Sequence, residues 1–243
     1  MKWISGIRTV LSYTLVGMGF LIFIPPCFII ACLPARYRYG NRVFFMLLGW
    51  FYKWIVYSSL NPVTILGVRN LPTTPAIFVA NHQSAFDIPV LGMLCKGYSH
   101  VWLVLAYYVT TPVLGFFITR MFVPVERGHA QKAAGSLRRV MRYIETHEAH
   151  LIIFPEGARY ADREIHPFFE GFAVVAKHTQ RPIIPVYLPT VGTIYPINSF
   201  YVHSAPLDII IGTPLYIQDG ETEAVFTERV RMWFKNEQQK YFS

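Results

Sequence analysis

Apolar residues divide the chain into two unequal parts. Residues 9–35 contain no charged side chain, and a second apolar, aromatic stretch follows at 43–60, where Lys53 is the single charge. Further along, short apolar runs alternate with turn residues and with stretches of helical periodicity. We therefore predict an N-terminal membrane-associated helical segment at 1–60, followed by an α/β domain at 61–243.

The first apolar stretch is long enough to cross a bilayer. As a helix rising ~1.5 Å per residue it reaches ~40 Å, whereas a hydrocarbon core measures ~30 Å. A cleaved signal peptide has an apolar region of only ~7–15 residues that ends in small residues, which disfavours that interpretation. The adjacent Pro25 and Pro26 would kink a simple span. Two arrangements therefore stay open, one kinked transmembrane helix or a two-helix hairpin dipping into one leaflet, besides a buried helix in a soluble core.

Basic residues are distributed unevenly around this stretch. Lys2 and Arg8 precede it, whereas Arg36, Arg38 and Arg42 follow it. Three arginines directly after the stretch disfavour burial in a soluble core. Since basic residues stay on the cytoplasmic side of a membrane, we expect a membrane-associated protein whose α/β domain faces the cytoplasm.

Beyond the apolar stretches, the pattern predicts the elements of an α/β domain. Short apolar runs typical of strands occur at 63–66, 76–80, 98–105, 121–125, 151–154, 183–187 and 207–211. Stretches typical of helices occur at 88–95, 131–147, 171–178 and 221–241. Because strands alternate with helices, we expect a mixed, partly parallel sheet flanked by helices, with functional residues along the rim where strands end.

Composition narrows the choice of partners. Apolar residues make up 53% of the chain and charged residues 15%, against roughly 45–50% and 25% in ordinary soluble domains. The net charge is +8, which suits membrane lipids or a phosphorylated substrate. Nucleic acid is disfavoured because the basic residues are scattered. The cysteines and histidines lack the spacing of metal ligands, so we expect no metal.

A histidine and an aspartate follow the predicted strand at 76–80. The chain reads Asn-His-Gln-Ser-Ala-Phe-Asp from residue 81, and Ser84 with an acid three residues later is typical of a helix start. His82 then lies in the turn, and Asp87 in the first helical turn can reach back to one imidazole nitrogen. The other nitrogen is left to take a proton from an alcohol. The alternative is a hydrogen-bonded loop histidine, with Asp87 favouring only the helix dipole.

A second polar group follows the predicted strand at 151–154. The sequence Pro-Glu-Gly-Ala-Arg brings Glu156, Gly157 and Arg159 to the same rim. An arginine suits bidentate recognition of a phosphate. The alternative is a turn formed by proline and glycine with solvated charges.

Taken together, these motifs resemble the glycerolipid acyltransferase family. The family motif N-H-x4-D is similar to residues 81–87, and F-P-E-G-T-R is similar to residues 154–159. An apolar strand ending in arginine is similar to residues 121–127, and an I-P-V strand with a further proline is similar to 184–189. All four motifs occur in the family order. The resemblance implies an enzyme of phospholipid biosynthesis.

The resemblance also implies a role for each matching residue. His82 would be the general base and Asp87 its orienting partner. The substrate-binding residues would be Arg127, Glu156, Gly157 and Arg159. The implied reaction moves a fatty acyl group from acyl-CoA or acyl-carrier protein to the sn-2 hydroxyl of 1-acyl-sn-glycerol-3-phosphate, giving phosphatidic acid. These co-substrates and membrane lipids are the implied partners, and no cofactor or metal takes part.

Departures from the family pattern keep other acceptors open. Ala158 stands where the family has threonine, and Phe169 where it commonly has lysine. A second lysine that family members often carry is also missing, because the corresponding region reads Ala106, Tyr107, Tyr108. The alternatives are therefore an acyltransferase or transacylase acting on a different lysophospholipid or an aminolipid, or a catalytically inactive lipid-binding membrane protein.

Overall fold

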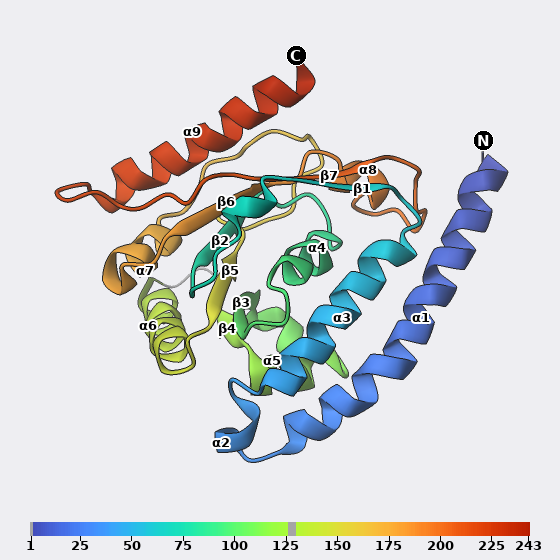
Figure 1. The fold of residues 1–243 in the computed structure, drawn as a ribbon, viewed down its shortest axis with the longest axis horizontal. Coiled ribbons are helices and arrows are strands. Elements are labelled where there is room, and N and C mark those ends of the chain that lie inside the picture. Colours follow the sequence, from blue (N-terminus) through green and yellow to red (C-terminus); the bar gives the residue numbers. More distant parts are fainter. Residues whose placement is uncertain (1, 126–129) are drawn as a thin grey trace.

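The computed structural model describes residues 2–125 and 130–243. At its centre lies a seven-stranded sheet in the order β1-β7-β6-β2-β5-β3-β4 (Figure 1). The strands are β1 (Val63–Leu66), β2 (Ile77–Ala80), β3 (His100–Leu105), β4 (Val123–Val125), β5 (His150–Ile153), β6 (Ile183–Tyr187) and β7 (Leu207–Ile211). The pair β6–β7 is antiparallel and the other pairs are parallel. The expected mixed sheet is confirmed.

Helices cover both faces of the sheet. They are α1 (Lys2–Cys32), α2 (Ala35–Arg38), α3 (Arg42–Ser58), α4 (Asp87–Leu94), α5 (Leu114–Met121), α6 (Ala130–Thr146), α7 (Gly171–Thr179), α8 (Val191–Ile194) and α9 (Glu223–Phe242). Short 3-10 turns, η1 (Val68–Asn70) and η2 (Ala106–Thr110), complete the order. The chain thus has the α/β architecture that the pattern predicted.

The central strand β2 separates two apolar cores. Phe78 and Ala80 face the core that α3 and α4 cover, whereas Ile77 and Val79 face the core that α6, α7 and α9 cover. Because successive side chains of a strand point to opposite faces, four consecutive apolar residues are needed to fill both cores. Because β2 is buried on both faces, its end is held firmly in the sheet. The polar residues of the site begin there.

The predicted strand at 121–125 begins too early. The apolar run at 121–125 was expected to be extended from its start, but Met121 is the last residue of α5 and β4 begins at Val123. Helix α5 itself was not predicted. Its buried Phe117, Ile118 and Met121 follow helical spacing, but short apolar runs do not distinguish a helix from a strand by periodicity alone.

The N-terminal helices form an antiparallel pair along one side of the molecule (Figure 1). Helix α1 continues through Pro25 and Pro26, and α3 returns beside it. Trp54 of α3 donates from Nε1 to the Leu15 carbonyl oxygen of α1 at 2.7 Å. A Cβ on Gly19 would lie 2.6 Å from the indole of Trp54, so glycine allows this close approach.

Helix α1 is also attached to the α/β domain towards each of its ends. Ser12 Oγ hydrogen-bonds to Tyr195 Oη at 2.8 Å, and Arg120 Nη1 donates to the carbonyl oxygen of Ala31 at 3.2 Å. The helix therefore lies along the domain rather than standing away from it. The boundary between 1–60 and 61–243 stays a prediction, and Val56 of α3 belongs to the core beside β2.

The outer side of α1 is apolar and uncovered. Among the described residues, one helix, at Ser5–Cys32, is long and apolar enough to cross a membrane, and 17% of its most apolar stretch is buried. Its exposed side chains include Val10, Leu11, Leu21 and Ile29. This apolar surface makes α1 a candidate for membrane contact.

Candidate active site

The site begins where β2 ends. Asn81 is buried, and its side-chain Nδ2 donates to the carbonyl oxygen of Leu188 at 3.0 Å while its Oδ1 accepts from the Leu188 N–H at 2.8 Å. This two-point contact ties the end of β2 to the residue that follows β6. The asparagine therefore fixes the position of the next residue, His82.

The buried Asp87 organises the turn between β2 and α4. Its Oδ2 accepts three hydrogen bonds, from Gln83 N at 2.7 Å, from Ser84 N at 2.9 Å and from His82 Nδ1 at 2.7 Å. Helix α4 begins at Asp87 itself. The sequence therefore placed the aspartate correctly in the first turn and in reach of the imidazole.

Ser84 does not act as the helix cap that the sequence suggested. Its Oγ donates to the carbonyl oxygen of Tyr195 at 2.7 Å and accepts from Phe86 N at 3.2 Å. Helix α4 starts later because the turn closes on the carboxylate of Asp87 instead. The serine thereby joins the turn to Tyr195, whose hydroxyl contacts α1 through Ser12.

The imidazole of His82 is held in a defined orientation. A carboxylate oxygen can only accept, so the contact with Asp87 places the ring proton on Nδ1 and leaves Nε2 with a lone pair. Phe154 stacks on the ring with centroids 3.9 Å apart and planes at 9°, and Trp102 stacks behind Phe154. The side chain stays 16% exposed, so the ring is accessible from solution.

The turn that follows β5 packs against His82. Tyr160 N donates to the carbonyl oxygen of His82 at 3.0 Å, and Gly157 N donates to the carbonyl oxygen of Phe154 at 3.1 Å. Gly157 has φ of 69°, a conformation that favours glycine. This turn brings Glu156 beside His82, and it carries Arg159 as an exposed side chain.

Glu156 is the most perturbed carboxyl group of the site. Burial raises its pKa to about 8, and the negative charge of Asp87 acts in the same direction, whereas the His82 backbone N–H opposes them. Within the described residues, its Oε1 is buried without a hydrogen-bond partner. A pKa this high leaves the carboxyl group mostly neutral at pH 7.

Of the six site residues that the sequence predicts, five lie together in the structure. Asp87 contacts His82 directly, and the turn containing Glu156, Gly157 and Arg159 lies against it. The sixth, Arg127, lies outside the described residues. No group of three or more possible metal ligands occurs in the described parts of the chain. The roles of all six residues, and the expected lack of a metal or cofactor, stay predictions.

Sequence reasoning missed Phe154 and the pair Ser84–Tyr195. Phe154 opens the second motif, but a residue's stacking partner cannot be deduced from its position in a motif. Tyr195 lies shortly after the motif at 184–189 but 111 residues after Ser84, and it reaches the site at the end of α8. No local pattern could have indicated it.

Comparison with known proteins identifies the family. A family model described as Acyltransferase matches residues 62–189. The chain belongs to the acyltransferase family. The matched region begins just before β1 and includes both motifs that meet at His82.

Several relatives carry the same name. A 1-acyl-sn-glycerol-3-phosphate acyltransferase of Cocos nucifera is 30% identical over 79% of this chain and 60% of that protein. One from Pseudomonas aeruginosa is 24% identical over 96% of this chain and 91% of that protein. A chloroplastic one from Brassica napus is 33% identical over 63% of this chain, which spans 44% of that relative. The chain thus covers less than two thirds of the two plant relatives.

A solved structure shares the fold. The 1-acyl-sn-glycerophosphate acyltransferase of Thermotoga maritima superposes with a TM-score of 0.75 at 21% identity, covering 99% of this chain and 98% of that one. This similarity includes the N-terminal helices as well as the sheet. It supports the described architecture as a whole.

The carboxyl group of Glu156 should make stability depend on pH. Its folded pKa of about 8 lies above the usual 4.5, so the unfolded chain releases this proton first and the folded state loses stability as pH rises between these values. We expect Glu156→Gln, which stays neutral, to lose less stability than the wild type from pH 6.5 to pH 8. The free energies of unfolding of the two proteins should diverge by at most about 1.4 kcal/mol per pH unit.

Thermal unfolding of both proteins in neutral detergent measures this difference. The buried His100 and His150 have pKa values lowered to about 4 by burial. They affect both proteins alike, so the comparison isolates Glu156. Parallel curves for the two proteins would show that Glu156 is ionised throughout this range.

Proposed function

We propose that the protein is a membrane-associated acyltransferase that acylates the sn-2 hydroxyl of 1-acyl-sn-glycerol-3-phosphate and gives phosphatidic acid. The observation that carries this proposal is the contact between His82 Nδ1 and the buried Asp87, which leaves Nε2 as a base beside the turn with Glu156 and Arg159. The names of the relatives support this acceptor. The acyl donor is a thioester, acyl-CoA or acyl-carrier protein.

The reaction needs a base because an alcohol is a weak nucleophile. Nε2 of His82 accepts the proton of the acceptor hydroxyl while the hydroxyl oxygen attacks the thioester carbonyl carbon. The carbon–sulfur bond then breaks, and the departing thiolate takes the proton back from the imidazolium. Asp87 stabilises the imidazolium between these two steps, since its charge lies 2.7 Å from Nδ1.

The electrostatics of the site favour an anionic acceptor. A phosphate monoester carries about −1.5 to −2 charges at pH 7, and an ionised carboxylate beside the base would repel it. Glu156 avoids that repulsion because burial keeps it mostly neutral. Arg159, exposed on the same turn, supplies a guanidinium that can bind the phosphate in a bidentate manner. Arg127 would act with it.

The attachment of α1 to the α/β domain supports one membrane arrangement. Because α1 contacts the α/β domain near Ser12 and again at Ala31, a perpendicular span would pull the domain into the hydrocarbon core. We therefore propose that the pair α1–α3 lies in one leaflet as a hairpin, with the active site near the membrane surface. The arginines that follow α1 support the cytoplasmic side for this surface.

The departures from the family pattern favour one second candidate. Ala158 and Phe169 replace residues that the resemblance leads us to expect, and the missing lysine would reduce the positive charge around an acceptor phosphate. A lysophospholipid whose phosphate carries a further headgroup needs less positive charge. A panel of lysolipids offered with one labelled acyl-CoA separates the two candidates.

Replacing the base should abolish transfer. We expect His82→Ala to lower kcat by ~10²–10⁴-fold, because that is the usual contribution of a positioned general base. The measurement is acyl transfer by the purified protein in mixed micelles. His178→Ala is the matched control, because His178 is an exposed histidine on α7.

The fold must be intact for this comparison to be valid. The thermal midpoint of His82→Ala in detergent establishes that the variant is folded at the assay temperature. We expect this midpoint to fall, because the variant loses the stacking on Phe154 and one of the three donors to Asp87. If the folded variant kept more than a third of the wild-type turnover, His82 would not be the base.

Replacing Arg159 should weaken acceptor binding selectively. We expect Arg159→Ala to raise the KM for the acceptor roughly ten- to a hundredfold and to leave the KM for the donor unchanged, because a charged hydrogen bond contributes ~1.5–3 kcal/mol. Arg159→Lys should recover part of the loss, since a point charge cannot reproduce the guanidinium fork. Steady-state kinetics with one substrate varied at a time measure both constants.

Arg231→Ala is the control for a general loss of charge. Arg231 lies on α9, where its partner is Glu228. A defect of Arg159→Ala confined to the donor KM would place the acceptor phosphate elsewhere and favour a different lysolipid.

A further inference from the structure

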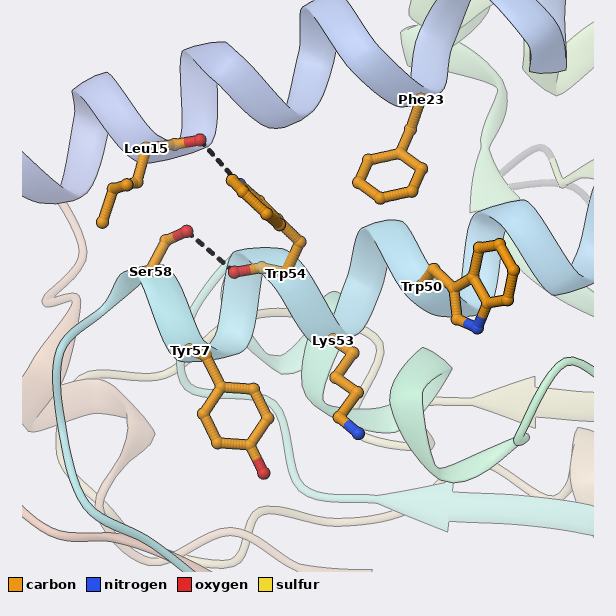
Figure 2. Close-up of a pocket in the computed structure, with 7 residues that line it drawn as sticks. All are labelled: Leu15, Phe23, Trp50, Lys53, Trp54, Tyr57 and Ser58. Carbon is orange, nitrogen blue, oxygen red and sulfur yellow. Dashed lines mark hydrogen bonds between the residues drawn. The ribbon is translucent and has the colours of Figure 1, made fainter.

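A cavity that opens widely to the surface lies between the two N-terminal helices, apart from the residues around His82. Its volume is about 430 Å³, within the range of small-molecule sites at ~300–1,000 Å³. Figure 2 shows its lining, which consists of Leu15 and Phe23 from α1 and of Trp50, Lys53, Trp54, Tyr57 and Ser58 from α3. No residue of the His82 site contributes to it.

The wall between the helices is rigidly built. The indole of Trp54 lies between α3 and α1, with its Nε1 donating to the Leu15 carbonyl oxygen (Figure 2). Ser58 Oγ donates to the carbonyl oxygen of Trp54 at 2.8 Å, and Gly19 leaves room for the ring. These contacts fix an apolar wall that does not depend on a ligand.

One edge of the cavity is polar. Trp50, Lys53 and Tyr57 recur at helical spacing on the exposed side of α3, and the Trp50 and Tyr57 side chains are 54% and 52% exposed. Lys53 Nζ lies 5.9 Å from the centroid of the Tyr57 ring. Within the described residues, no carboxylate forms an ion pair with Lys53.

An ammonium in this position can bind an anion. Lys53 is the single charge in residues 43–60, and the neighbouring α1 exposes an apolar surface suited to a membrane. Tryptophan and tyrosine accumulate at the level of lipid headgroups, and a lysine beside apolar surface extends its ammonium to that level. The anions available there are lipid phosphates.

We propose that this cavity binds one phospholipid with an anionic headgroup. Its phosphate contacts the Lys53 ammonium and the Tyr57 hydroxyl, and one acyl chain lies along Leu15 and Phe23. Because this lipid joins α1 to α3, it stabilises the hairpin in the membrane. This site is separate from the acceptor site and does not depend on the reaction proposed above.

A lipid titration of the full-length protein tests the site. Short-chain phosphatidylglycerol is added to the protein in neutral detergent, and binding is followed by tryptophan fluorescence and by calorimetry. We expect saturable binding of one molecule. Phosphatidylcholine of the same chain length should bind at least about tenfold more weakly, and inorganic phosphate should give no saturation because it lacks the chain.

Three variants identify the residue responsible. Lys53→Gln should weaken phosphatidylglycerol binding at least about tenfold, as expected for loss of a charged contact. Lys53→Arg should keep most of the affinity. Lys235→Gln removes the same charge from an exposed position on α9 and should bind like the wild type. Thermal midpoints establish that every variant is folded.

Several results would overturn the proposal. These are equal weakening in Lys53→Gln and Lys235→Gln, equal affinity for the two lipids, or saturation by inorganic phosphate alone. Acyl transfer in neutral micelles distinguishes this site from the acceptor site. Lys53→Gln should transfer at the wild-type rate, and a loss of transfer would place Lys53 in the active site instead.

Discussion

A single buried carboxylate oxygen holds the candidate site together. Oδ2 of Asp87 accepts two backbone N–H groups of the β2–α4 turn and the Nδ1 proton of His82. The same contacts thus shape the turn, start the helix and orient the imidazole. An unpaired charge at this depth would be costly, and three donors to one oxygen offset that cost. This atom therefore defines the position of His82 and of the turn that carries it.

The sheet supplies the remaining constraints from separate parts of the chain. Asn81 ties the end of β2 to Leu188 after β6, and the turn after β5 closes on the carbonyl oxygen of His82 through Tyr160. Because β5, β2 and β6 are adjacent and parallel, their carboxyl ends meet at one rim. Burial at this rim keeps Glu156 mostly neutral, so a base and an anion-binding arginine can share the site.

The sequence predicted the site better than its surroundings. The spacing from His82 to Asp87 indicated their contact because that contact is local, within one turn. The stacking of Phe154 and the bond from Ser84 to Tyr195 depend on how distant segments pack, which no spacing encodes. Long apolar strands such as β6 were predicted with their correct ends, whereas α5 was missed because a short apolar run fits a helix or a strand equally well. The apolar length of α1 was evident, but its attachment along the domain was not.

The position of the ring proton on His82 is the decisive measurement. Imidazole nitrogen-15 spectra of histidine-labelled protein in neutral micelles, recorded above neutral pH, report this position, and the His82 signals are assigned by their loss in His82→Ala. We predict a proton on Nδ1 and a free lone pair on Nε2, and Asp87→Ala should remove this preference. A proton on Nε2 in the wild-type protein would contradict it, because that nitrogen could not then accept the proton of an acceptor hydroxyl.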